Sequence, residues 1–130
     1  MSRAKAVVEQ AAFEALSAAV TSASVFQDAP ADAAGWLVIL GELKSFGRGG
    51  KGTSGDRRVQ ISIVTIGEAE ERAPLLAIQE QIETALDGLS LVTSDGWTLA
   101  FGFEEDDAVL DEDGSTYTGV SLFSVIALAP

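Results

Sequence analysis

The clearest pattern of hydrophobic and polar positions lies between residues 57 and 86, where a two-residue period gives way to a helical one. Val59, Ile61 and Ile63 alternate with polar residues at its start, which is typical of a half-buried strand. After Gly67, apolar residues recur every three or four positions, as in an amphipathic helix: Leu75, Ile78, Ile82 and Leu86. We therefore predict a strand packed under the following helix as the centre of the core. No residue of this unit is a candidate for catalysis.

The remaining pattern predicts a second helix and further strands. Residues 4–20 are rich in alanine and carry an apolar stripe, so we expect a helix there. The apolar run from Trp36 to Leu40 favours a strand buried on both faces, although its periodicity also fits a helix. Other strands are expected at 24–26, 97–103 and 116–128, and residues 89–92 fit either a short strand or a packed connector.

Together these elements predict one α+β domain that spans residues 1–130. We expect an antiparallel or mixed β-sheet of about four to five strands, with the two helices packed on one face. A chain of 130 residues can hold a core without metals or disulfides. Two connections are expected to be solvated: a mobile, glycine-rich loop at residues 43–56 and an acidic loop at residues 104–115.

The composition excludes several kinds of chemistry. The chain has no cysteine and no histidine, so disulfides, zinc–thiolate sites and a Ser-His-Asp triad are excluded. Chemistry based on lysine or carboxylates stays open. We predict that the protein is not an enzyme and has no catalytic residue, cofactor or metal.

Charge is distributed unevenly along the chain. The formal net charge is −12, from 8 basic and 20 acidic residues, which disfavours nucleic-acid binding. Five of the eight basic residues lie within residues 44–58: Lys44, Arg48, Lys51, Arg57 and Arg58. With Asp56 that stretch carries 5 − 1 = +4, and the remainder carries −12 − 4 = −16. We interpret it either as a flexible connector or as a partner-contact arm that orders on an acidic surface.

Four local patterns are candidate ligand sites. Gly50-Lys51-Gly52 lacks the spacing of a phosphate-binding loop and precedes a strand. Residues 111–114 supply only fragments of a calcium loop, without the downstream glutamate. Carboxylates on an exposed loop lack the apolar surroundings that acid–base catalysis needs. Aromatic residues could line a pocket, but core packing is favoured for Trp36; the 97–103 strand fits either core or a subunit contact.

Four features, in this order along the chain, resemble the tail-completion, or tail-terminator, proteins of long-tailed bacteriophages and gene transfer agents. The alanine-rich first helix ends at Val20 and is followed by Val25-Phe26-Gln27-Asp28-Ala29-Pro30. Trp36-Leu37-Val38-Ile39-Leu40-Gly41-Glu42 is similar to that family's aromatic-Val-Val-Leu-Gly strand. The last feature is the alternating strand from Val59 to Val64, with its helix. The resemblance covers residues 6–88. Gly35 departs from the family's frequent proline, and the acidic residues 104–113 have no counterpart.

The resemblance implies an α+β fold and a hexameric ring that caps the tail tube, ends tail growth and joins tail to head. It implies a structural protein whose partners are its own copies, the tail tube protein and the head–tail connector. Monomers before assembly are compatible with this. DNA would pass through without specific binding, and no membrane is involved, since no apolar run approaches the ~20 residues of a span. The expected location is the virion, and the bacterial cytoplasm during assembly.

Two other functions stay open. A head–tail connector or stopper would differ from a terminator in the partner that it caps. A small-molecule-binding α+β domain is the third reading, and the missing histidine and cysteine count against it without excluding it.

Overall fold

A computed structural model describes residues 3–28, 34–47 and 55–130 of the chain. Two α-helices and six β-strands follow in the order α1 (Ala4–Ala19), β1 (Ser24–Phe26), β2 (Leu37–Gly47), β3 (Arg57–Glu68), α2 (Ala73–Leu86), β4 (Ser90–Val92), β5 (Thr98–Leu110) and β6 (Thr116–Leu128). The predicted α+β class is therefore confirmed.

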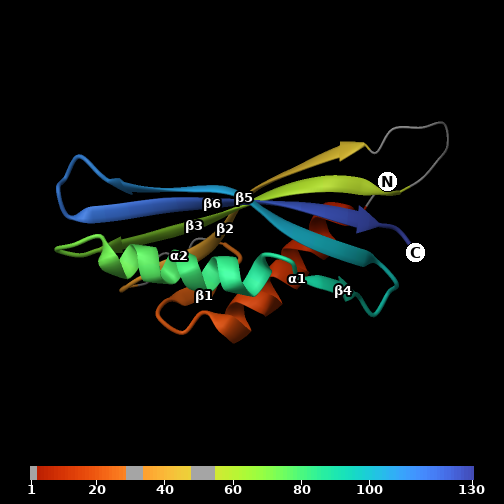
Figure 1. The fold of residues 1–130 in the computed structure, drawn as a ribbon, viewed down its shortest axis with the longest axis horizontal. Coiled ribbons are helices and arrows are strands. Elements are labelled where there is room, and N and C mark those ends of the chain that lie inside the picture. Colours follow the sequence, from red (N-terminus) through yellow and green to blue (C-terminus); the bar gives the residue numbers. More distant parts are fainter. Residues whose placement is uncertain (1–2, 29–33, 48–54) are drawn as a thin grey trace.

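All six strands belong to one sheet, in the order β1-β2-β3-β6-β5-β4. The prediction of four to five strands was too low, because residues 90–92 form a strand of their own beside β5. The sheet is mixed, since β1 runs parallel to β2 while the other neighbours are antiparallel. Both helices lie on the same side of it (Figure 1). We call that side the helix face and the opposite side the open face.

The core lies between the helices and the helix face. Val59, Ile61 and Ile63 of β3 are fully buried there, as their alternation predicts. The predicted stripe of α2 is buried as well, and the helix ends at Leu86, two residues before Gly88, whose φ of 77° only glycine adopts readily. Phe123 of β6 is fully buried and contacts Phe103 edge-to-face, with ring centroids 5.7 Å apart. The strand–helix unit therefore forms the centre of the core.

Parts of two expected loops are strand, while residues 48–54 of the expected glycine-rich loop lie outside the described residues. Residues 43–47 continue β2, where Ser45 pairs with Val59 and Gly47 with Arg57. Residues 104–110 belong to β5 and pair with β6, so the expected acidic loop is wrong for them; only residues 111–115 form the turn. In both cases pairing with a regularly alternating strand overrides the low strand propensity of glycine and acidic residues.

The strand at 36–40 also differs from its prediction. It was expected to be buried on both faces, yet only Val38 and Leu40 are buried, while Leu37 and Ile39 are half-buried. The reason is that both helices cover a single face of the sheet, so the apolar side chains on the other face remain partly accessible.

Candidate interaction surface

The open face of the sheet is covered by neither of the described helices (Figure 1). Its centre consists of half-buried apolar side chains from neighbouring strands, which the strand registers bring together: Leu37, Ile39, Val64, Ile66, Val120, Leu122 and Ile126. A soluble monomer seldom leaves so many contiguous apolar side chains partly exposed without a use. This face is therefore a candidate for contacts with other protein surfaces.

A bulge in β2 shapes one part of the open face. The register between β2 and β3 shifts between Leu40 and Leu43, and the hydroxyl of Ser62 bonds the backbone there instead. It accepts a hydrogen bond from Glu42 N at 2.7 Å and donates to Glu42 O at 3.5 Å. Gly41 makes this possible, because a Cβ at that position would lie 2.6 Å from Ser62 Oγ. The bulge presents Glu42 and its neighbours outward.

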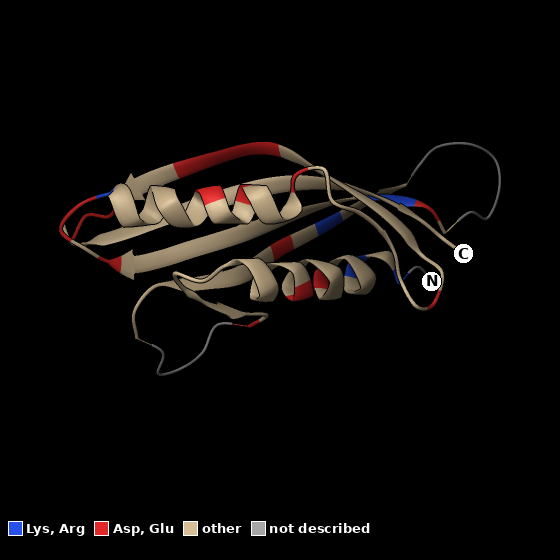
Figure 2. Ribbon diagram, turned by 60° about the horizontal axis from the view of Figure 1, so that its bottom comes forward, with Lys and Arg blue, Asp and Glu red and all other residues tan. Residues whose placement is uncertain are grey.

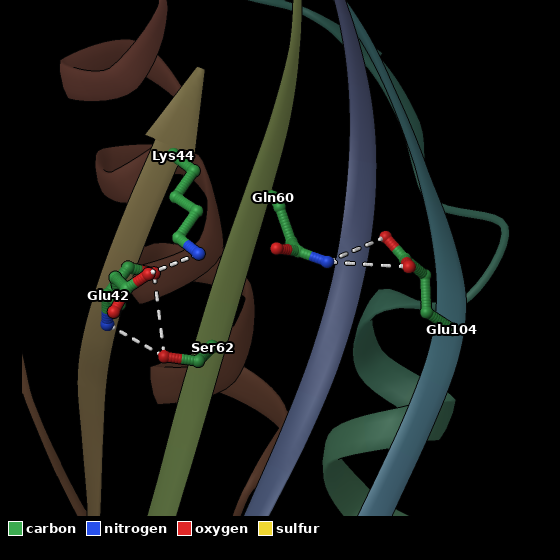
Figure 3. Close-up of polar contacts among 5 residues, drawn as sticks. All are labelled: Glu42, Lys44, Gln60, Ser62 and Glu104. Carbon is green, nitrogen blue, oxygen red and sulfur yellow. Dashed lines mark hydrogen bonds and ion pairs between the residues drawn. The ribbon is translucent and has the colours of Figure 1, made fainter. Parts of the chain in front are cut away.

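Polar side chains surround a shallow hollow beside this bulge (Figure 3). Lys44 Nζ lies 3.2 Å from Glu42 Oε1, and Gln60 Nε2 reaches over β6 to Glu104, 3.4 Å from Oε2. The hollow has a volume of about 270 Å³, and Val120 and Leu122 complete its lining. Both members of the ion pair are more than half exposed, so the pair adds little stability. The arrangement offers hydrogen-bonding and charged groups to a partner.

The predicted basic arm is divided between two paired strands. Lys44 lies on β2, while Arg57 and Arg58 lie on β3. Arg58 stacks over Phe46 at 4.2 Å from the ring centroid, which fixes it beside the end of β2. Arg57 donates a hydrogen bond to Asp56 O. Arg48 and Lys51 lie outside the described residues. The structure thus brings Lys44 and Arg58 to one end of the sheet's β2 side.

Four consecutive carboxylates lie on β5, toward the opposite edge of the sheet from Lys44. Glu104, Glu105, Asp106 and Asp107, which we call the acidic row, are all exposed and lie on β5. Figure 2 shows this band along one margin of the sheet. Within the described part of the chain, no lysine or arginine lies within 4 Å of these carboxylates. The sequence analysis identified these residues as an acidic group but predicted a loop, whereas they form part of a strand.

A second hollow lies between α1 and the β4–β5 turn. It has a volume of about 720 Å³, and its lining includes an ion pair between Arg3 and Asp95 at 3.1 Å. The hydroxyl of Thr93 donates to Asp95 and, with Arg3, lowers the pKa of that carboxyl. The groove was not predicted, because it depends on the packing of α1 beside a turn some 90 residues away.

The turn between β5 and β6 uses its acidic residues for internal bonds. Asp113 accepts hydrogen bonds from Ser115 N, Thr116 N and the Thr116 hydroxyl, and Asp111 accepts one from Thr118. The Thr116 hydroxyl and the two N–H groups lower the pKa of Asp113. These carboxylates therefore stabilise the turn of the β5–β6 hairpin. Among the described residues, no cluster of three or more ligating side chains is placed to hold a metal ion.

This turn predicts a dependence of stability on pH. A lowered pKa in the folded state means that the Asp113 carboxylate stabilises the fold above its unfolded pKa of about 3.9. That contribution is lost as pH falls through the folded pKa. Asp113→Asn should be less stable than wild type at pH 7, and the difference should shrink at pH 3. Urea unfolding at both pH values tests this, with Glu112→Gln as the control; an equal difference at both pH values would contradict it.

Comparison with known proteins shows which of them resemble this chain. No protein-family model matches the chain, and no curated protein matches its sequence. Among solved structures, a chain in the virion of a native gene transfer agent particle is similar, with a TM-score of 0.78 and 22% sequence identity. The match covers 98% of this chain and 100% of the other. The two chains share a fold from end to end. None of the described helices has the length and apolar character needed to cross a bilayer.

Proposed function

We propose that this chain is a structural virion protein, a tail terminator that forms a ring on the end of a tail tube. The observation that carries the proposal is the likeness of fold to a chain of a gene transfer agent virion, at a TM-score of 0.78 over nearly the whole of both chains. The four ordered sequence features within residues 6–88, which resemble tail-terminator proteins, support the finer role. In this role the ring ends tail growth and joins tail to head.

The surface chemistry supports a protein that works by docking. The open face offers half-buried apolar side chains. Exposed charged groups lie toward both edges of the sheet, on β2 and on β5. In a ring the partners would be further copies of the chain, the tail tube protein and the head–tail connector. Basic residues at one end of β2 and β3 and acidic residues on β5 suit a head-to-tail contact that closes by rotation.

Electron microscopy of particles made without this protein tests the proposal. Loss of a terminator should give tails of uncontrolled length that lack heads, together with separate filled heads. A head–tail connector or stopper would instead give heads that leak DNA, with tails of normal length. Particles of normal form would overturn both roles and favour a small-molecule-binding domain. Resupplying the wild-type chain should restore normal particles, which controls for damage to neighbouring genes.

A further inference from the structure

Two long strands expose backbone edges that no described strand covers. β1 pairs with β2 only at residues 37–39, and β4 pairs with β5 only at residues 98–100. The outer edges of β2 at residues 43–47 and of β5 at residues 103–110 are therefore unpaired among the described residues. Side chains bond β5 at two positions, from Phe103 N to Asp87 and from Gln79 to Asp107 O. Within residues 3–28, 34–47 and 55–130, no strand pairs with the other outward backbone groups of these two segments, which leaves them available to another chain.

The two edges have compatible directions in the sheet and face each other when one copy is displaced along the strands. Between β2 and β5 lie β3 and β6, and each neighbouring pair is antiparallel. Consequently β2 and β5 run in opposite directions. The registers link Leu43 to Ile61, Ile61 to Phe123, and Phe123 to Phe103, so Leu43 and Phe103 lie at the same height. From that height, residues 43–47 of β2 and residues 103–110 of β5 extend in opposite directions, because the registers place Ser45 level with Phe101. A second copy in the same orientation, displaced by about four residues along the strands, would bring its β2 segment antiparallel to the acidic row with Ser45 opposite Asp106, which is a favourable ladder geometry.

The charges on the two edges distinguish between ways of pairing. Pairing β5 with β5 would bring two copies of the acidic row together, which like-charge repulsion disfavours. On the other edge, Lys44 lies on β2 and Arg58 is held beside it by Phe46. Exposed apolar side chains also lie on both edges: Phe46 is 39% exposed on β2, and Val109 is 49% exposed on β5. Opposite charges and apolar contacts therefore favour β2 against β5.

We propose that copies of this chain associate head to tail by antiparallel pairing of the β2 edge of one copy with the β5 edge of the next. The partner is a second copy, and its acidic row faces Lys44 and Arg58 of the first. This inference deepens the proposed ring-forming function and rests on it. Neighbouring copies would then share a continuous sheet, with the helices of every copy on the same side of the assembly.

Site-directed crosslinking tests the pairing directly, because the chain has no cysteine of its own. Ser45 and Asp106 are exposed, lie on the two edges, and pair with the helix-face residues Val59 and Ser121. The double variant Ser45→Cys/Asp106→Cys, treated with a flexible bismaleimide at millimolar protein concentration, should give a ladder of covalent oligomers. Each single variant should give no ladder, since head-to-tail pairing never brings identical positions together.

Matched controls separate this pairing from other contacts. The double variant Ser45→Cys/Glu83→Cys carries its second cysteine on an exposed position of α2 and should give no ladder. Covalent dimers from one single variant, or a ladder from the α2 control, would overturn the edge pairing. Native mass spectrometry of the untreated protein distinguishes the edge pairing from the terminator role. Oligomers that do not crosslink through the edges, or monomers at every concentration, would overturn the pairing and leave the terminator role to the particle experiment.

Charge exchange gives a second, independent readout. Lys44→Glu should weaken association about tenfold, because it sets another carboxylate against the acidic row. Combining it with Glu105→Lys in the same chain should recover most of that loss. Lys5→Glu, at an exposed position of α1, is the control for net charge. If Lys44→Glu and Lys5→Glu weaken association equally, the charge complementarity of the edges is refuted.

Discussion

Replacing Phe123 by alanine is expected to lower the free energy of unfolding by about 3–5 kcal/mol. Phe123 is fully buried on β6, where it pairs with Ile61 on one side and Phe103 on the other. Its ring meets that of Phe103 at an interplanar angle of 75°. Alanine would leave a cavity between the sheet and the helices and would remove this edge-to-face contact. Urea unfolding followed by tryptophan fluorescence measures the loss.

Leu128→Ala is a suitable control for Phe123→Ala. Leu128 lies at the end of the same strand and is 38% exposed, so its truncation should cost less than about 1 kcal/mol. The slope of unfolding free energy against urea should stay unchanged in both variants if they fold to the same state. A loss below about 1 kcal/mol for Phe123→Ala would mean that Phe123 is not packed in the core as described.

Gly119→Ala is expected to destabilise the fold by about 2–4 kcal/mol, because a side chain there overpacks the sheet and displaces a buried amide. A Cβ at Gly119 would overlap Gln79 Nε2 and would lie 2.9 Å from Asp107 O. Gln79 donates to that same carbonyl at 2.6 Å and is 5% exposed. The substitution would therefore shift β5 and leave a buried amide without its acceptor. Thermal and urea unfolding measure the effect.

Two variants separate the causes of the Gly119 effect. Gly102→Ala is the steric control, because Gly102 also lies in a strand. A Cβ at Gly102 would have Ser124 O as its nearest neighbour, at 4.0 Å, so the free energy of unfolding should change by no more than about 0.5 kcal/mol. The double variant Gly119→Ala/Gln79→Ala removes the flexible neighbour but not the backbone contact with Asp107. Partial recovery in the double variant is expected. Full stability of Gly119→Ala would show that α2 and β5 do not approach as closely as described.

The candidate surface follows from features that are separated in the sequence. Lys44, Arg57 and Arg58 were grouped by sequence proximity as part of one arm, and the structure instead places them on two adjacent strands. Glu104 to Asp107 were grouped as a loop because acidic residues are disfavoured in strands. They form part of β5 because β6 pairs with Glu105, Asp106 and Asp107, after a register shift at Glu104. Whether these groups contact a partner stays a prediction, which the crosslinking experiment tests.

The sequence by itself determined the strand–helix unit of residues 57–86, the alanine-rich first helix and the α+β class. Each of these depends on local periodicity and on residues such as Gly88, which act within a few positions. Only the tertiary structure decided the strand order, the length of β2 and β5, and the face left open. Those features depend on pairings between residues far apart in the sequence, such as Phe103 and Phe123. Local strand propensity does not include the energy of such pairings. The side of the sheet on which the helices pack decides which alternate residues remain accessible to a partner.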